Sequence, residues 1–148
     1  MKNFILILFL LLAAGCSTII LQPADFSWPV ESVLLVNDKG FINEERHSFE
    51  INVKPIFYEE FQDSNYVVGK EIRIICNKDG YFYFTGTGFK NVYQFTPIVS
   101  GLKLNEKINI SDSISLKSPA FNQKINAIEL VDGTNKYLIN GSEIVRVK

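Results

Sequence analysis

The chain has few of the residues that carry chemistry in enzymes. Its 148 residues include two cysteines and one histidine, His47. That histidine lies in the polar stretch 43–48, and nothing in the sequence brings it to Cys76. The chain also contains no Ser–His–Asp arrangement, no nucleophile elbow and no His/Cys metal motif. Residues 86–88, Gly-Thr-Gly, are too short for a phosphate-binding fingerprint. We therefore expect a protein without enzymatic activity, cofactor or metal.

An excess of positive charge is also missing. The 15 Lys and Arg residues are balanced by 16 Asp and Glu residues, and no segment is strongly basic. Proteins that bind nucleic acids usually carry a basic patch or stripe, so we expect no nucleic-acid partner. Apolar residues make up 47% of the chain, and the glycine and proline content is ordinary, which predicts a folded chain.

The long apolar runs of membrane-spanning proteins are absent too. The longest run, residues 4–14, is shorter than the roughly 20 apolar residues that a transmembrane helix needs. Lys2 precedes this run and small residues follow it, which is the order found in a secretory signal. A buried core helix is the less favoured alternative.

The end of the apolar run carries a more specific motif. The residues Ala13, Ala14, Gly15 and Cys16 resemble the lipobox of bacterial lipoproteins, in which the cysteine becomes the lipidated first residue of the mature protein. The family usually has leucine where this chain has Ala13. The resemblance covers only the first 17 residues. It implies cleavage before Cys16 and a membrane partner reached through acyl chains, two of which anchor a protein firmly.

The resemblance implies that residues 1–15 are a signal peptide and that Cys16 is lipidated. Residues 16–29, with Pro23 and Pro29, are interpreted as the lipidated N-terminus and a tether, and the β pattern of the rest predicts a single β domain at 30–148. The resemblance also implies a cell-envelope location, and Ser17 favours the outer membrane if the cell is Gram-negative. Cys76 then has no internal disulfide partner. Its place in the alternating stretch 72–76 favours a buried small hydrophobe over a nucleophile.

Period-two alternation dominates from Val30 onward. Apolar Phe49, Ile51 and Val53 alternate with polar residues, the pattern of a half-buried strand. Pro55 predicts a bulge, an edge or a strand end, and short helical turns fit only 59–64 or 118–124. Further strands are expected at 33–36, 72–76, 81–85, 92–96, 125–130, 137–139 and 143–147. We predict an all-β fold, a small antiparallel meander or sandwich or a partly closed barrel, of about seven to nine strands.

Turn signals support this fold class. Residues 37–40 and 77–80 are Asn-rich or Asp-rich and end in glycine, and Asp132-Gly133 and Asn140-Gly141 predict tight hairpins. The first two turns lie 40 residues apart in the sequence. This separation is close to the length of a propeller blade, about 40–45 residues. Residues 30–148 are too few for the four blades of a typical propeller, so a propeller-like fragment is only the alternative.

Aromatic residues are concentrated in 81–95. Residues 81 and 83 would point to one side of a strand and residues 82 and 84 to the other. If one sheet face is solvated, the exposed aromatics could stack on sugars or form a partner surface; if both faces are covered, they belong to the core. Covered faces are the favoured interpretation. The candidate surface residues are Tyr81, Tyr83, Phe89 and Tyr93.

An acidic cluster, Glu59, Glu60 and Asp63, offers a second candidate site. Paired carboxylates can perform acid–base chemistry or bind calcium, but this spacing matches no known motif, and a solvated turn is favoured. The leading hypothesis is a lipid-anchored envelope protein that acts as a non-enzymatic binding or structural module, with an envelope protein or glycan as partner. The alternatives are a hydrolase or carbohydrate-active enzyme that uses Glu59 or Asp63, and an accessory subunit of an envelope complex.

Overall fold

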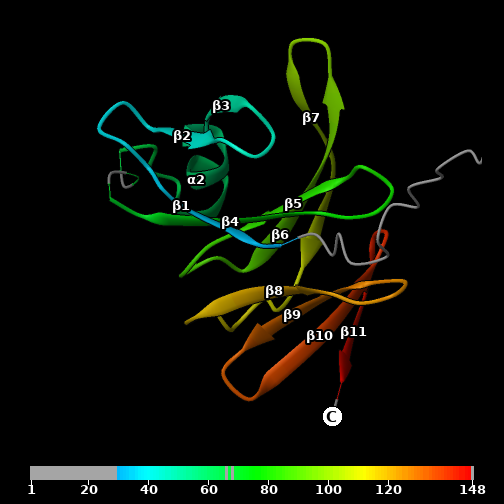
Figure 1. Cartoon of the computed structure of the whole chain (residues 1–148). Coiled ribbons are helices and arrows are strands. Elements are labelled where there is room, and N and C mark those ends of the chain that lie inside the picture. Colours follow the sequence, from blue (N-terminus) through cyan, green and yellow to red (C-terminus); the bar gives the residue numbers. More distant parts are fainter. Residues whose placement is uncertain (1–29, 66, 68, 148) are drawn as a thin grey trace, which may run out of the picture.

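Three antiparallel sheets and one helix make up the described residues, 30–65, 67 and 69–147, of a computed structural model (Figure 1). The five-stranded sheet has the order β1-β4-β5-β6-β7, with β1 at Ser32–Leu35, β4 at Glu71–Cys76, β5 at Phe82–Thr85, β6 at Asn91–Ile98 and β7 at Gly101–Asn109. The four-stranded sheet has the order β11-β10-β9-β8, with β8 at Pro119–Gln123, β9 at Ile128–Asp132, β10 at Asn135–Asn140 and β11 at Glu143–Val147. A hairpin of β2, Phe41–Glu44, and β3, Phe49–Asn52, precedes helix α2, Lys54–Phe61. The predicted all-β fold is confirmed as an open sandwich.

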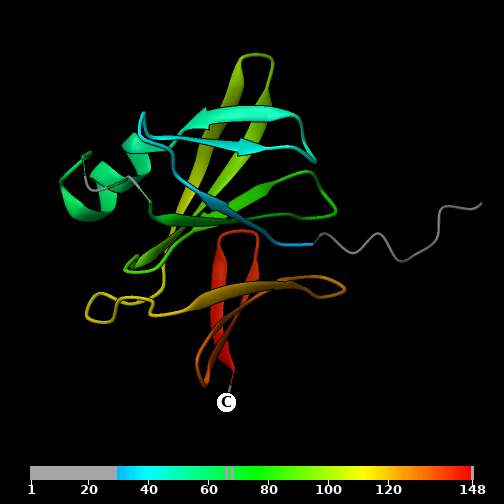
Figure 2. The ribbon, with the colours of Figure 1, turned by 60° about the vertical axis from the view of Figure 1, so that its left-hand side comes forward.

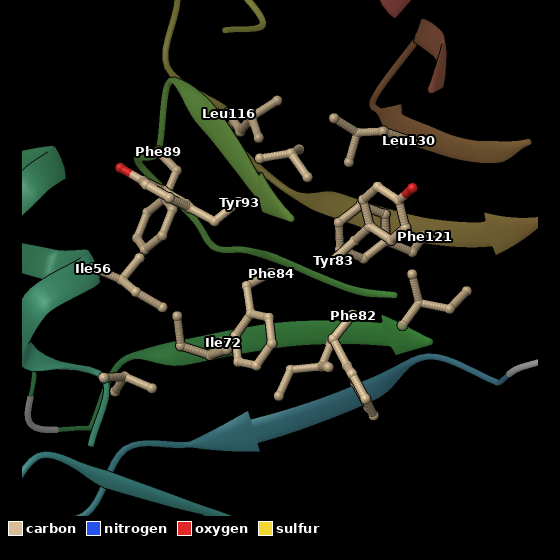
Figure 3. Close-up of a cluster of buried hydrophobic side chains, with 14 of the residues drawn as sticks. Ile56, Ile72, Phe82, Tyr83, Phe84, Phe89, Tyr93, Leu116, Phe121 and Leu130 are labelled. Carbon is tan, nitrogen blue, oxygen red and sulfur yellow. The ribbon is translucent and has the colours of Figure 1, made fainter. Parts of the chain in front are cut away.

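The sheets form layers. The five-stranded sheet lies in the middle, with the β2–β3 hairpin and α2 on one face and the four-stranded sheet on the other (Figures 1 and 2). As a result all four residues of β5 are buried. Phe84 and Ile72 point toward α2, whereas Tyr83 points toward Phe121 and Leu130 of the four-stranded sheet (Figure 3). One hydrophobic core therefore contains side chains from every layer.

The two asparagine turns have the same local structure. Asn37 Oδ1 accepts hydrogen bonds from the backbone N–H groups of residues 39 and 41, and Asn77 Oδ1 does the same for residues 79 and 81. Gly40 and Gly80 close the turns with φ values of 86° and 83°, which glycine adopts without steric cost. The first turn joins strands of different sheets, and the second joins neighbours in one sheet. The two turns therefore share a pattern of hydrogen bonds and do not mark the repeats of a propeller.

Two segments with helical potential behave differently. Strand β3 ends before Pro55, as predicted. Pro55 lies in the first turn of α2, where backbone N–H groups have no partner within the helix, so the N–H that proline lacks is not needed there. The helix begins earlier than the short turn expected at 59–64. Within 118–124, residues Pro119–Gln123 form strand β8 instead of a helical turn, because pairing with β9 buries Phe121 opposite Leu130.

The described residues contain eleven strands, more than the seven to nine expected, because β2, β7 and β8 have weak sequence signals. Strand β7 is mostly exposed, and its pairing with β6 holds it in place. Strand β5 pairs with β6 only as far as Phe95, whereas β6 and β7 continue to pair with each other. Residues 96–103 of these two strands and their turn form an arm that projects from the sandwich (Figures 1 and 2). Val99 at its tip is fully exposed.

A partly buried ion pair links the two large sheets. Glu31 accepts a hydrogen bond from the backbone N–H of Phe121 at 2.8 Å and one from Arg73 Nη1 at 2.9 Å. Arg73 lies on β4, and Phe121 lies on β8, an edge strand. Burial raises the pKa of Glu31, although the Phe121 N–H and the Arg73 guanidinium oppose the shift. The segment just before β1 is thereby attached to both sheets.

Candidate functional site

The aromatic residues between 81 and 95 do not form the exposed row that one reading of the sequence allowed. Tyr83, Phe89 and Tyr93 are 1%, 0% and 2% exposed, and only Tyr81, at 36%, reaches the surface. The reason is that the layers cover both faces of the five-stranded sheet. Phe89 packs edge-to-face against Phe57 of α2, with ring centroids 5.3 Å apart. Three of the four candidates are therefore core residues.

Tyr93 takes part in a hydrogen-bonded network around Glu60. The Glu60 carboxylate accepts hydrogen bonds from Lys90 N at 2.9 Å, Asn91 Nδ2 at 2.7 Å and Tyr93 Oη at 2.9 Å. Burial raises the pKa of the Tyr93 phenol, and the negative charge of Glu60 raises it further. Glu60 thus holds α2 against the start of β6.

The other members of the acidic cluster have separate partners. Glu59 Oε1 forms an ion pair with Lys107 Nζ at 2.6 Å, and Asp63 Oδ1 accepts a hydrogen bond from Asn65 N at 2.8 Å. The described residues contain no group of three or more His, Cys, Asp or Glu side chains arranged to hold a metal ion. The three carboxylates therefore do not converge on one site.

Cys76 and His47 also have separate surroundings. Burial raises the pKa of the half-buried Cys76 thiol, which keeps it in the unreactive protonated form. The His47 ring packs edge-to-face against Phe82, with centroids 4.9 Å apart. These contacts give both side chains a packing role, in line with the interpretation of Cys76 as a small hydrophobe.

A polar cleft lies where three turns meet at one end of the sandwich. The turns are those between β4 and β5, between β8 and β9, and between β10 and β11, which lie close together on the right of Figure 1. We call it the turn cleft. Its volume is about 130 Å³. Its polar and aromatic lining consists of Asn77, Lys78, Asp79, Tyr81, Tyr83, Gln123, Asn126 and Asn140.

Several polar groups of the turn cleft have unused hydrogen-bonding capacity. Gln123 Nε2 donates to the carbonyl oxygens of Lys124 and Ala127, but Gln123 Oε1 is buried and accepts no hydrogen bond from the described residues. Buried polar atoms usually have a partner, so this acceptor is unusual. Within the same part of the chain, the Asn140 amide and the Tyr81 hydroxyl make no hydrogen bond.

Two contacts fix the walls of the turn cleft. Lys78 Nζ donates to Asn126 Oδ1 at 3.3 Å, which joins the β4–β5 turn to the β8–β9 turn. Gln94 Nε2 donates to Tyr83 Oη at 2.7 Å and to the Gly141 carbonyl oxygen at 3.3 Å. The Tyr83 hydroxyl proton stays available to a further acceptor. The cleft therefore offers several donors and acceptors on a supported frame.

An apolar groove of about 390 Å³ forms a second surface feature. Its walls are the β3–α2 region, through Ile51 and Ile56, and the base of the arm, through Phe95 and Leu104. The polar part of its lining consists of Glu50, Asn52 and Ser100, so it has fewer amide side chains than the turn cleft.

The fold and the turn cleft define an all-β sandwich with a polar recess at one end. Comparisons with protein-family models, curated proteins and solved structures find no match. Ala13, Ala14, Gly15 and Cys16, which are predicted to form a lipobox, lie outside the described residues. Among the described residues, no helix has the length and apolar character to cross a bilayer.

Sequence reasoning identified Tyr81 and Tyr83 as candidates but missed the amides beside them. Gln123 and Asn140 are the last residues of β8 and β10, and Asn126 lies in the turn after β8. Of these three, only Asn140 belongs to a sequence signal, that of the hairpin at Asn140-Gly141. The one available signal was the number of amide side chains in and beside three separate turns. Nothing in the local sequence shows that these turns meet.

Proposed function

We propose that this protein is a lipid-anchored protein of the bacterial cell envelope, attached through Cys16, whose β domain is a non-enzymatic binding module. The observation that carries the binding role is the turn cleft, where amide and hydroxyl groups of Tyr81, Asn126 and Asn140 line one recess. The anchor rests on the resemblance of residues 13–16 to the lipobox.

The carboxylate contacts favour this proposal over a hydrolase. Acid–base catalysis by two carboxyl groups needs a shared site in which their surroundings push the pKa values apart. Glu59 and Asp63 instead bind Lys107 and Asn65, and Glu60 accepts three hydrogen bonds from the β6 region. These side chains serve the packing of α2. The turn cleft contains one carboxylate, that of Asp79.

The anchor is tested by comparing Cys16→Ser with the matched variant Cys76→Ser, because the chain has only these two cysteines. Each full-length form is produced in a Gram-negative host with a lipoprotein pathway and labelled with a palmitate analogue. We expect wild type and Cys76→Ser to be labelled, processed and recovered in the outer-membrane fraction. Cys16→Ser should lose the label and the firm attachment. Unchanged processing and membrane attachment of Cys16→Ser would show that the proposal is wrong.

A further inference from the structure

We infer that the turn cleft binds a single neutral pyranose unit at the end of a glycan. This inference rests on the binding role proposed above and names the ligand class of the same site. It follows from four properties of the cleft: its mixture of donors and acceptors, the aromatic ring at its edge, its balanced charge and its volume.

The polar groups of the cleft match the hydroxyl groups of a sugar. A hydroxyl both donates and accepts hydrogen bonds, and an amide side chain offers both functions a short distance apart. The side-chain amides of Asn126 and Asn140 and the Tyr81 hydroxyl line the cleft and offer both functions to a ligand.

The Tyr81 ring suits the apolar face of a pyranose ring. Tyr81 is 36% exposed and lines the cleft, so part of its ring is open to contact. An aromatic residue with an apolar body and a polar tip can pack against the C–H face of a sugar while its hydroxyl forms a hydrogen bond.

The charge of the cleft disfavours an ionic ligand. Lys78 and Asp79 line the same recess, and they are its only charged residues among those described. A phosphate or carboxylate would meet Asp79, and a cationic side chain would meet Lys78. Like charges placed together weaken binding, so a neutral ligand avoids both penalties.

The volume limits the ligand to one sugar unit. Pockets for drug-sized ligands have about 300–1,000 Å³. The turn cleft has about 130 Å³, well below that range. It can receive the hydroxyl-bearing edge of one ring, while the rest of the glycan stays outside. So small a contact predicts weak binding, with a dissociation constant of about 1 mM.

The test is an NMR titration of the isotope-labelled mature lipoprotein in micelles of a detergent without a sugar headgroup. The probes are the methyl glycosides of glucose, galactose and N-acetylglucosamine. We expect at least one of them to shift the side-chain amide signals of Gln123, Asn126 and Asn140. Tyr81→Ala should weaken binding about tenfold, and Asn126→Ala should also weaken it. Tyr58→Ala is the matched control, because Tyr58 is 53% exposed on α2 and does not line the cleft.

Three outcomes would overturn the inference. They are the absence of amide shifts with all three glycosides, binding that survives both Tyr81→Ala and Asn126→Ala, and larger shifts with inorganic phosphate or acetate than with the glycosides. Unchanged amide spectra away from the cleft show that each variant is folded. If glycosides fail to bind a protein that is labelled with palmitate at Cys16, the sugar assignment alone is wrong. If glycosides bind while Cys16→Ser stays anchored, the anchor alone is wrong.

Discussion

Replacing Glu60 by alanine should destabilise the protein much more than the same change at the neighbouring Glu59. The Glu60 carboxylate accepts hydrogen bonds from Lys90 N, Asn91 Nδ2 and Tyr93 Oη at 2.7–2.9 Å. All three donors lie at or just before the start of β6. Glu60 therefore makes three polar contacts between α2 and the central sheet, whereas Glu59 makes one, with Lys107 of β7.

The size of the effect follows from these three hydrogen bonds. A hydrogen bond to a charged group contributes about 1.5–3 kcal/mol, and one between neutral groups about 1 kcal/mol. Glu60 is half-buried, so water can reach some of the donors after the substitution, and we take about 1 kcal/mol for each bond. The free energy of unfolding should fall by about 3 kcal/mol. In a domain of this size, this lowers Tm by about 12 °C.

The assay is urea unfolding of wild type, Glu60→Ala and Glu59→Ala, followed by circular dichroism. Glu59 is the matched control because it lies on the same helix and pairs with Lys107, but the two side chains are 52% and 39% exposed. Such exposed ion pairs contribute about 0–1 kcal/mol to the free energy of unfolding. Combining Glu60→Ala with Tyr93→Phe should give a coupling energy of about 1 kcal/mol, since the two side chains share a hydrogen bond.

Equal losses of unfolding free energy in Glu60→Ala and Glu59→Ala would contradict this prediction. Additive effects of Glu60→Ala and Tyr93→Phe would contradict it as well. Either result would mean that the network is replaced by water without cost, and that apolar contacts such as Phe57 with Phe89 hold α2 in place.

Two further predictions concern pH. Burial raises the pKa of Glu31 above its ordinary value of 4.5, so its contribution to stability is complete below that pH and is lost as the pH rises through the folded-state pKa. The unfolding free energy of wild type should therefore decline relative to Glu31→Gln as the pH rises from about 4.5, and a constant difference in urea titrations would contradict this. Burial also raises the pKa values of Tyr83 and Tyr93 above 10.0, so the folded protein should keep both phenols protonated and lose stability as the pH rises beyond that value. An ultraviolet absorbance titration in which all six tyrosines ionise together, before unfolding, would refute it.

The turns were the most predictable part of this protein, because their chemistry is local. Asn37 and Asn77 each bond to backbone groups within four residues, and a glycine closes each turn. Strands β7 and β8 were missed for the opposite reason. Strand β7 lacks an alternating apolar pattern, and β8 begins at Pro119; both depend on pairing with a neighbouring strand.

Burial of the aromatic cluster and the location of the turn cleft could not be derived from sequence alone. The residues of β5 alternate in direction, but whether one face or both are covered depends on how the layers stack. The cleft brings together Asn77, Gln123 and Asn140, which belong to three different hairpins. Such a site arises from the packing of two sheets, and short-range sequence patterns carry no information about that packing.

The contacts around Val30 have a mechanical consequence. Arg46 donates hydrogen bonds to the carbonyl oxygens of Val30 and Glu31, both at 2.9 Å, and to the Ser32 hydroxyl. A pulling force on the chain before Val30 therefore loads these bonds before it reaches the β1–β4 ladder. Glu31 passes part of that load to Arg73 on β4 and to the edge of β8. The entry of the domain is thus reinforced against peeling of β1, which is an edge strand and would otherwise be the first element to detach under tension.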